Sequence, residues 1–454
     1  MPSSLPSHDP SLRIAVIGAG VSGLSAAWLL GTRHEVTIYE AADRLGGHAN
    51  TVDAPSPKGG VTAVDTGFIV YNEVNYPNLT ALFAHLGVAT RHADMSLAVS
   101  LDDGKIEYGS HNLASLFAKP SNLVRPRFWA MLRDLNRFYR TAPGDLQTLD
   151  PVISLDEYLR ERGYCAAVQE DHLLPMAAAI WSATVAGVRE HPAAAFIRFF
   201  HNHDLLRFLG RRSWRTVVGG SRSYVARMAE TFRGEIRTGC GVASVRRTAD
   251  GVLVRDVHGE TRVFDHVVFG AHAPQVLKML EDPTPQEQAV LGAFRYTPNV
   301  AVLHGDRSLM PRRRLAWASW NHIGWRADPA AGSVTYWMNK LQSLHGARPL
   351  FLTLNPHKAP DPATVIRTEH YDHPHYDARS MAAQKQLWSL QGARRTWFCG
   401  AYFGSGFHED GLQAGLAVAE QLGGVRRPWT VEDESGRIVI TPAQPADAET
   451  VEAV

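Results

Sequence analysis

Residues 13–47 read RIAVIGAGVSGLSAAWLLGTRHEVTIYEAADRLGG, and this stretch decides the fold. The run Ile14–Ile17 is apolar on both faces, which is typical of a strand buried inside a parallel α/β sheet. Three glycines follow it with G-x-G-x-x-G spacing: Gly18, Gly20 and Gly23. The first allows a tight turn, the second lets backbone approach a pyrophosphate, and the third lets the next helix pack closely on the strand. That helix is predicted to begin near Val21, so the amides of Val21 and Ser22 would face the phosphates of a dinucleotide.

Glu40 follows the second predicted strand, Val36–Tyr39, and lies 22 residues after Gly18. A carboxylate at this position can accept hydrogen bonds from ribose hydroxyls. It would also repel a 2′-phosphate, so NADP is disfavoured at this site.

The motif EAADRLGG, residues 40–47, comes next. Together with the glycine turn it resembles the start of the flavin-containing amine oxidase superfamily, which includes amine oxidases, phytoene-type desaturases, protoporphyrinogen oxidases and flavin-dependent fatty acid isomerases. The resemblance implies FAD. Arg44 can neutralise diphosphate charge, and Gly46 and Gly47 let backbone pass close to a flavin or its phosphate. The alternative for Arg44 is a solvated loop beside a turn.

Two distant segments resemble the same superfamily. Near the C-terminus, residues 396–400 form a predicted strand and residues 410–419 a predicted helix start, similar to the closing strand and helix that run beside the flavin. The resemblance implies cofactor contacts from Gly400, Gly411 and Leu412. In mid-chain, residues 217–221 open a helix and residues 242–245 lie in an alternating strand. There the resemblance implies that Val242 touches adenine.

A chain of 454 residues is too long for one hydrophobic core and suggests two domains. We expect an α/β fold in which a discontinuous Rossmann-type FAD-binding domain carries an inserted α+β substrate-binding domain. The FAD-binding domain is assigned residues 11–75, 214–285 and 390–424. The substrate-binding domain is assigned residues 76–213, mostly helical, and 286–389, rich in sheet. Residues 1–10 and 425–454 are expected to be tails, with a short strand at 437–440.

The composition, 45% hydrophobic and 20% charged, is that of an ordinary soluble globular protein. Lysine and arginine total 46 against 45 acids, so no overall charge favours nucleic acid. The three cysteines, Cys165, Cys240 and Cys399, form no metal-ligand spacing and no disulfide framework, which fits a reducing cytoplasm. The first residues lack a signal-peptide pattern, and no apolar run reaches the length of a spanning helix. Cys399 lies in a predicted buried strand, so we expect FAD to be bound non-covalently.

No second G-x-G-x-x-G is present. The nearest candidate, Gly400 to Gly406, has Glu409 where the last glycine should stand. NAD(P)H is therefore not expected to deliver electrons, and the organic substrate either reduces the flavin or reacts without net redox change.

The candidate catalytic residues are His48 and Lys340. His48 follows Gly46 and Gly47 directly, and a hydrogen-bonding loop histidine is the alternative. Lys340 could correspond to the lysine that many amine oxidases hold near flavin N5, but an exposed strand-end lysine fits the local sequence better. Asp65 follows a strand and is interpreted mainly as a turn cap, while Glu409 and Asp410 precede the closing helix and are interpreted as capping acids. No metal ligands are predicted.

Three segments mix basic and aromatic residues: 119–129, 207–215 and 312–320. Such composition suits a membrane surface, since arginines meet anionic headgroups and tryptophans settle at the interface. A solvated basic loop is the alternative. If the membrane interpretation holds, the substrate is a lipid and the protein sits on the inner face of the membrane.

The chain as a whole resembles a bacterial branch of FAD-binding proteins related to the desaturases. The resemblance implies a desaturase, or a related isomerase, acting on an unsaturated or methylated fatty acyl lipid, with hydride passing to flavin N5. Two alternatives stay open at this point. One is an amine oxidase that releases hydrogen peroxide, and the other is a non-catalytic flavin-binding scaffold.

Overall fold

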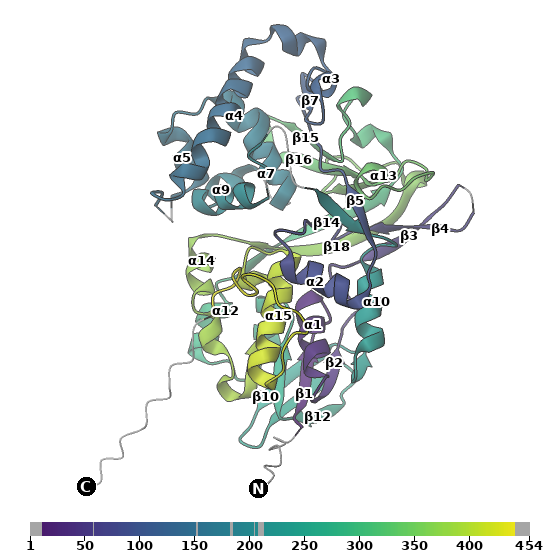
Figure 1. The fold of residues 1–454 in the computed structure, drawn as a ribbon, viewed down its shortest axis with the longest axis vertical. Coiled ribbons are helices and arrows are strands. Elements are labelled where there is room, and N and C mark those ends of the chain that lie inside the picture. Colours follow the sequence, from purple (N-terminus) through teal and green to yellow (C-terminus); the bar gives the residue numbers. More distant parts are fainter. Residues whose placement is uncertain are drawn as a thin grey trace, which may run out of the picture. The chain divides into compact units, whose positions relative to one another are not determined.

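The computed structural model describes residues 11–57, 59–150, 153–181, 185–203, 205–207 and 213–440. The chain divides into two compact units, shown in Figure 1. Unit 1 takes its residues from Met1–Asp43, Arg233–Ala293 and Met381–Val454, and unit 2 from Arg44–Phe232 and Phe294–Ser380. Each unit is therefore built from separated parts of the sequence.

Unit 1 is organised by a five-stranded parallel sheet. Its order is β19 (Thr396–Phe398), β13 (His266–Phe269), β1 (Arg13–Ile17), β2 (Glu35–Tyr39) and β9 (Glu235–Arg237). The predicted strands at the N-terminus and at residues 396–398 are confirmed, and they meet in one sheet through β13. The apolar run of β1 predicts this parallel α/β arrangement. Four of the five residues of β1 are buried, as expected for an inner strand.

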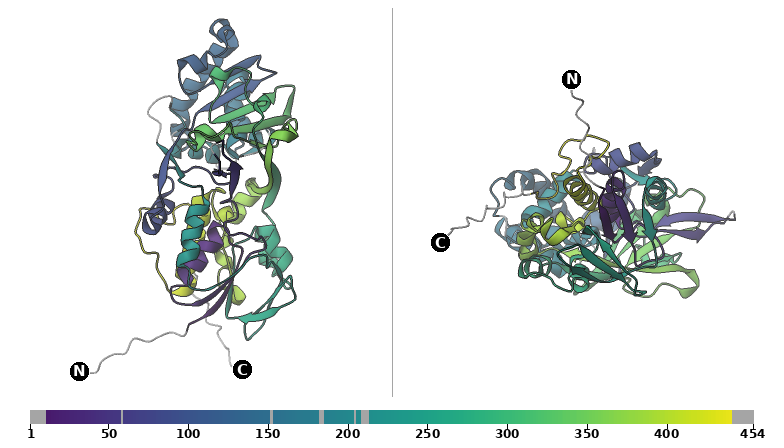
Figure 2. Two further views of the ribbon diagram at one scale, coloured as in Figure 1. Left: turned by 90° about the vertical axis from the view of Figure 1, so that its right-hand side faces the viewer. Right: turned by 90° about the horizontal axis from the view of Figure 1, so that it is seen from below.

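Two helices of unit 1, α1 (Val21–Leu30) and α15 (His408–Gly423), lie side by side in Figures 1 and 2. All ten residues of α1 are buried. A Cβ added at Gly415 would lie 2.1 Å from the Ser22 carbonyl oxygen and 2.3 Å from Ser25 Oγ, both in α1. Glycine at this position therefore lets the two helix backbones approach each other closely.

The rest of unit 1 carries an antiparallel sheet of β10 (Val242–Arg247), β11 (Val252–Asp256) and β12 (Thr261–Phe264), with helices α11 (Ala273–Met279) and α12 (Pro285–Leu291). The strand expected at residues 437–440 is wrong, because Arg437 ends a turn and residues 438–440 form no strand. Arg437 there donates from Nε to Asp410 Oδ1 at 2.6 Å, and Trp429 stacks on Trp28 with ring centroids 6.1 Å apart. Residues 425–440 are thus fixed on unit 1 instead of forming the start of a tail.

Unit 2 contains a seven-stranded sheet in which only the β6–β15 pair is parallel. Its order is β18 (Val365–His375), β14 (Arg295–His304), β17 (Phe351–Leu354), β16 (Asp328–Trp337), β15 (Trp320–Trp325), β6 (Leu97–Leu101) and β7 (Ile106–Gly109). Two strand pairs accompany it: β3 (Thr51–Pro55) with β4 (Val61–Asp65), and β5 (Thr90–Ala93) with β8 (Trp214–Val217). The second inserted segment is sheet-rich, as predicted.

The first inserted segment is mostly helical, as predicted. Its helices are α2 (Pro77–Leu86), α3 (Leu113–Leu116), α4 (Pro126–Asp145), α5 (Leu155–Glu161), α6 (Ala166–Val168), α7 (Leu174–Trp181), α8 (Val185–Glu190) and α9 (Ala193–Asn202). Unit 2 also contains α10 (Arg222–Thr231) and α13 (Met338–Leu341), which lie outside this segment. The apolar stretch 176–188 is shared between α7 and α8, with 182–184 outside the described residues.

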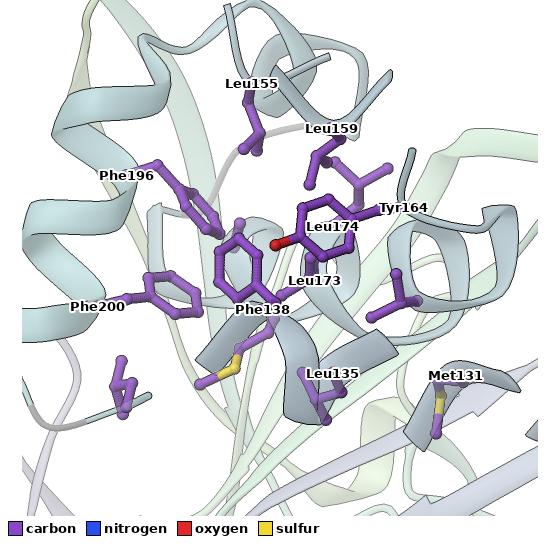
Figure 3. Packing of buried hydrophobic residues seen from close by; sticks show 14 of the residues in the cluster. Met131, Leu135, Phe138, Leu155, Leu159, Tyr164, Leu173, Leu174, Phe196 and Phe200 are labelled. Carbon is purple, nitrogen blue, oxygen red and sulfur yellow. The ribbon is translucent and has the colours of Figure 1, made fainter. Parts of the chain in front are cut away.

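A hydrophobic core joins these helices (Figure 3). Phe138 of α4 packs edge-on against Phe196 of α9, with ring centroids 6.2 Å apart, and Phe196 stacks on Phe200 at 4.1 Å. All three side chains are fully buried. Aromatic pairs in these geometries contribute about 0.5–1.5 kcal/mol beyond area burial, which stabilises the packing of α4 against α9.

The division into units differs from the predicted domain segments in four places. Residues 286–293 and 381–389 belong to unit 1, whereas the sequence assigned them to the substrate-binding domain. Residues 44–75 and 214–232 belong to unit 2, whereas the sequence assigned them to the FAD-binding domain. Their assignment to cofactor binding stays a prediction. No helix among the described residues is long and apolar enough to cross a membrane.

Candidate functional site

The glycine turn of unit 1 has the geometry that its spacing predicts. Gly18 has a φ of +96° and donates its N–H to the Tyr39 carbonyl at 2.8 Å. A Cβ at Gly23 would lie 2.0 Å from the Gly18 carbonyl oxygen, so only glycine lets α1 start this close to β1. Gly270, which sequence reasoning missed, closes the same contact: a Cβ there would lie 2.7 Å from Gly23 Cα.

Gly20 differs from its neighbours because a Cβ there would meet no heavy atom within 4 Å. It is the N-cap residue of α1, no side chain caps the helix, and the first turn holds no acid. The first amides of a helix have no carbonyl partner inside the helix and carry a partial positive charge. The open side at Gly20, beside the amides of Val21 and Ser22, therefore fits a pyrophosphate.

Glu40 is held at the end of β2 by two backbone amides of the same unit. Ala19 donates to Oε2 at 2.7 Å and Ala42 donates to Oε1 at 2.9 Å. A carboxylate offers about four acceptor positions, so acceptor capacity for two ribose hydroxyls is left. The carboxylate is oriented before any ligand arrives.

Val242 lies next to this glutamate. Cys240 donates its N–H to the Glu40 carbonyl at 2.8 Å, and Gly239 donates to the Ala42 carbonyl at 2.7 Å. The half-buried Val242 begins β10 two residues later. The structure thus brings the N-terminal and mid-chain segments together, as the resemblance implies.

The closing segment, around residues 400–412, contacts the start of α1. A Cβ at Gly411 would lie 2.9 Å from Val21 Cγ1, and Leu412 beside it is fully buried. Gly400 follows β19, and a Cβ there would lie 2.4 Å from the Tyr402 ring. Gly411 therefore allows close packing against the start of α1, and Gly400 allows close packing against Tyr402, whatever contact they make with a cofactor.

Glu409 and Asp410 are part of the first turn of α15, so the prediction that they precede the helix is wrong by two residues. Asp410 is fully buried and accepts from the amides of Phe407 at 2.7 Å and Ser405 at 3.0 Å. Glu409 accepts from Gln413 Nε2 at 3.0 Å. The capping interpretation is confirmed for Asp410.

Cys399 is fully buried at the end of β19. Burial raises the pKa of its thiol to about 12. The thiol is therefore protonated at neutral pH and is a poor nucleophile, in keeping with the expectation of non-covalent FAD.

In unit 2 the loop after Asp43 needs both of its glycines. Gly46 has a φ of +105° and Gly47 a φ of +56°, and a Cβ at Gly46 would lie 2.6 Å from the Ala49 carbonyl oxygen. Arg44 donates from Nη1 to the Gly47 carbonyl at 3.0 Å. The loop is thus fixed by its own backbone, and a role of Arg44, Gly46 and Gly47 at the diphosphate stays a prediction.

His48 contacts two rings from β18 of the same unit. Its ring centroid lies 5.0 Å from that of Tyr371 and 5.6 Å from that of His373. The Tyr371 hydroxyl is hydrogen-bonded to Asn50 at 2.9 Å and to Thr66 at 2.8 Å, and burial raises its pKa. Sequence reasoning missed Tyr371 and His373, because more than 300 residues separate them from His48 and no local pattern links them.

Asp65 is 1% exposed and accepts hydrogen bonds from three segments of unit 2. Thr51 Oγ1 donates to Oδ1 at 2.6 Å, Ser221 donates to Oδ1 from both N and Oγ at 2.8 Å, and Gln342 Nε2 donates to Oδ2 at 2.7 Å. Ser221 is the N-cap residue of α10. Asp65 therefore caps a helix 156 residues away, and its interpretation as a cap of its own turn is wrong. Burial raises its pKa to about 6, against the lowering effect of these hydrogen bonds.

Lys340 lies in α13 (Met338–Leu341) and is 25% exposed on its side chain. Its Nζ donates to Ser96 Oγ at 3.0 Å and lies 3.5 Å from Asp94 Oδ1, which also accepts from Ser319 Oγ at 2.7 Å. Although burial raises the pKa of Asp94, hydrogen bonds from Ser96 and Ser319 and the charge of Lys340 lower it overall. Lys340 is therefore a partly buried, paired lysine and not an exposed one, and its role at the flavin stays a prediction.

Comparison with known proteins gives a family that agrees with the observed fold. Residues 21–308, more than half of the chain, match the family described as flavin containing amine oxidoreductase. Over 40 residues, 9% of this chain and 8% of the relative, the sequence is 55% identical to an L-amino-acid oxidase from Pseudechis australis. The chain thus spans less than a tenth of the length of the curated relatives it matches.

Solved structures match almost the whole chain at low identity. A CLA-producing fatty acid isomerase from P. acnes matches with a TM-score of 0.63 and 14% identity, covering 92% of this chain and 98% of that one. A cyclohexylamine oxidase from Brevibacterium oxydans matches with a TM-score of 0.61 and 15% identity, covering 91% and 100%. At such identities the likeness shows the fold alone.

The family match defines the class of the protein, an FAD-dependent oxidoreductase. The chain belongs to the flavin containing amine oxidoreductase family. This membership supports an enzyme over the non-catalytic scaffold that the sequence left open.

Proposed function

We propose that the protein is a desaturase, or a related isomerase, of an unsaturated or methylated fatty acyl lipid. The choice of a desaturase or isomerase over an amine oxidase rests on one observation, which concerns the aromatic residues expected around the substrate of an amine oxidase. The C-terminal motif offers Tyr402 and Phe403 for a cage around a substrate amine. Both are 2% exposed, with Tyr402 packed under Gly400 and Phe403 edge-on against Trp388 at 6.2 Å. Rings buried in the core of unit 1 do not present a face to a cation.

When bound, FAD supplies a hydride acceptor at N5. The chain's own residues would hold the cofactor: the amides of Val21 and Ser22 would bind the pyrophosphate, and Glu40 would bind the ribose hydroxyls. Gly18, Gly20 and Gly23 would leave room for these contacts, and Val242 would contact adenine. Gly400, Gly411 and Leu412 of the closing segment would contact the flavin portion.

His48 is proposed to take or return the proton that accompanies hydride transfer. Imidazole titrates near neutral pH, and the contact with Tyr371 orients the His48 ring. Lys340, paired with Asp94, is the second candidate. The substrate's reacting carbon must be held close to the flavin, and this positioning supplies much of the rate.

Electrons are proposed to come from the substrate and to leave to oxygen or a membrane acceptor, because no second dinucleotide motif is present in the sequence. The proposed location is the cytoplasm, with peripheral contact at the inner face of the membrane where an acyl lipid would be found.

Anaerobic stopped-flow absorbance tests the proposal. An unsaturated or methylated acyl lipid should bleach the flavin of a desaturase, or be rearranged without net bleaching by an isomerase, while NADH and NADPH act slowly or not at all. His48→Gln should slow the lipid reaction by about 10²–10⁴-fold, and His345→Gln, an exposed loop histidine, should not. Rapid reduction by NADPH with no response to any lipid would overturn the proposal.

An amine oxidase is the second candidate, supported by the 40-residue similarity to an L-amino-acid oxidase and by the fold of cyclohexylamine oxidase. It would consume oxygen and release hydrogen peroxide with a small soluble amine. Peroxide formation with amines and none with acyl lipids would select it.

A further inference from the structure

One surface of unit 2 gathers large exposed apolar side chains. The exposed leucines and the exposed tryptophan found in the described residues all come from two stretches, 113–129 and residue 315. Their exposed fractions are 75% for Leu113, 52% for Leu123, 49% for Trp129 and 54% for Leu315, and Val124 between them is 81% exposed. Other large exposed hydrophobics of the described chain are valines and one isoleucine scattered over both units.

The fold brings the two stretches together, although about 190 residues separate them in sequence. Leu113 begins α3, which packs beside η4 (Arg314–Ala316), the turn that carries Leu315. A Cβ at Gly109 would lie 2.8 Å from the Ala316 carbonyl oxygen and 3.1 Å from Ser115 of α3. Trp129 donates its indole N–H to the Leu123 carbonyl at 2.9 Å, which fixes the indole beside Leu123 and Val124.

Three cations from or next to the same two stretches bind backbone carbonyls of the turn Gly104–Lys105. Lys119 donates from Nζ to the carbonyls of Gly104 at 2.8 Å and Lys105 at 2.7 Å, and Arg125 donates to the Lys105 carbonyl. Arg313 reaches the Gly104 carbonyl at 3.4 Å. The cations of this surface are Lys105, Lys119, Arg125, Arg312, Arg313 and Arg314.

Three carboxylates lie among these six cations. Asp102 accepts from Arg326 Nε at 2.7 Å and also interacts electrostatically with Lys105. Glu107 is fully buried and pairs with Arg313 at 2.9 Å, and Asp103 lies 3.4 Å from Arg312. Lys105 and Arg314 are exposed. Positive charge is therefore in excess around the exposed apolar side chains.

We propose that this surface, defined by Leu113, Leu123, Val124, Trp129 and Leu315 with the six cations, docks on an anionic lipid bilayer. Leucines and a tryptophan enter the interface while the cations meet phosphate headgroups. Nucleic acid would use the cations but would leave the leucines in water, and a second copy of the chain would oppose cation to cation. The inference extends the proposed function by naming the surface that meets the lipid phase.

The test measures binding without turnover, so that its failure and a failure of the proposed substrate are distinguishable. The full chain with FAD is sedimented with vesicles of phosphatidylcholine and phosphatidylglycerol, and separately with phosphatidylcholine alone. Binding is expected only to the anionic vesicles and should weaken as salt rises.

Two triple variants probe the two parts of the surface. Lys105→Gln, Arg312→Gln and Arg314→Gln together should weaken vesicle binding by about a hundredfold, since each cation near an anionic surface contributes about fivefold. Leu123→Ser, Val124→Ser and Leu315→Ser together should weaken it at least about tenfold.

Matched controls alter the same chemistry elsewhere. Arg233→Gln, Arg246→Gln and Arg255→Gln remove three exposed cations of unit 1, and Val61→Ser, Val74→Ser and Val365→Ser remove three exposed valines of unit 2. Both controls should bind as the unaltered chain does.

Several results would overturn the proposal. These are no sedimentation with anionic vesicles, equal weakening by the controls, or binding to single-stranded RNA in place of vesicles. A dimer in analytical ultracentrifugation that the leucine variant breaks, without vesicle binding, would assign the surface to a second copy instead.

Discussion

Replacing Asp65 by asparagine should change how the stability of the protein depends on pH. The folded state raises the pKa of this carboxyl from its ordinary value of 3.8 to about 6, chiefly through burial. A group whose pKa is raised on folding contributes stability that is fully present below its unfolded pKa and is lost as pH rises through the folded pKa. A difference of about two pKa units corresponds to about 3 kcal/mol.

The free energies of unfolding of the unaltered chain and of Asp65→Asn should therefore differ by an amount that depends on pH. An asparagine side chain does not titrate, so the pH dependence that Asp65 contributes is absent from the variant. The free energy of unfolding of the unaltered chain, minus that of Asp65→Asn, should rise by about 3 kcal/mol as pH falls from above 6 to below 4. On top of this, the introduced side-chain amide meets the Gln342 amide, which in the unaltered chain donates to Oδ2 of Asp65 at 2.7 Å. This mismatch should cost about 1–3 kcal/mol at every pH.

Urea titrations of the FAD-saturated protein, followed by circular dichroism across this pH range, measure the difference. Asp53→Asn, on the same hairpin, is the control. Asp53 is exposed and its hydrogen bond with Arg222 lowers its pKa, so its contribution is lost as pH falls, the opposite sign. A difference for Asp65→Asn that stays constant or shrinks as pH falls would refute the argument that burial controls this carboxyl.

Three further outcomes are expected. Glu40→Ala should weaken FAD binding by about 1–3 kcal/mol in equilibrium dialysis because it removes a charged acceptor from the ribose, and unchanged affinity would remove Glu40 from the site. Gly415→Ala should lower stability by about 1–3 kcal/mol in thermal denaturation, since its Cβ would meet the Ser22 carbonyl at 2.1 Å; unaltered stability would mean that α15 is free to shift. Acid denaturation should release intact FAD, detected by chromatography, because Cys399 is buried and protonated, and flavin left on the precipitated chain would contradict non-covalent binding.

The N-terminal segment of unit 1 could be predicted in detail, since the sequence signals for its elements are local. An apolar run, a spaced set of glycines and a terminal acid predict β1, α1, β2 and the place of Glu40, and the structure confirms these elements. Each depends on contacts within about 30 residues, where backbone geometry leaves few options. The closing helix was predicted in the same way, two residues late.

Residues 437–440 show the limit of such local signals. The apolar residues Ile438–Ile440 favour a strand by propensity, but a strand needs a partner edge. Here Arg437 is bound to the buried Asp410, and this tertiary contact decides the conformation.

The sequence by itself determined the class of fold, the dinucleotide turn and the family, because these rest on short patterns that the backbone enforces. Only the tertiary structure decided that Asp65 caps α10 across 156 residues, that Tyr371 lies against His48 and that Lys340 is paired with Asp94. Such contacts join residues far apart in the chain, and their formation depends on how all the elements pack. No local sequence pattern encodes the packing of all the elements. The surroundings of the predicted site residues could therefore be found only in the folded molecule.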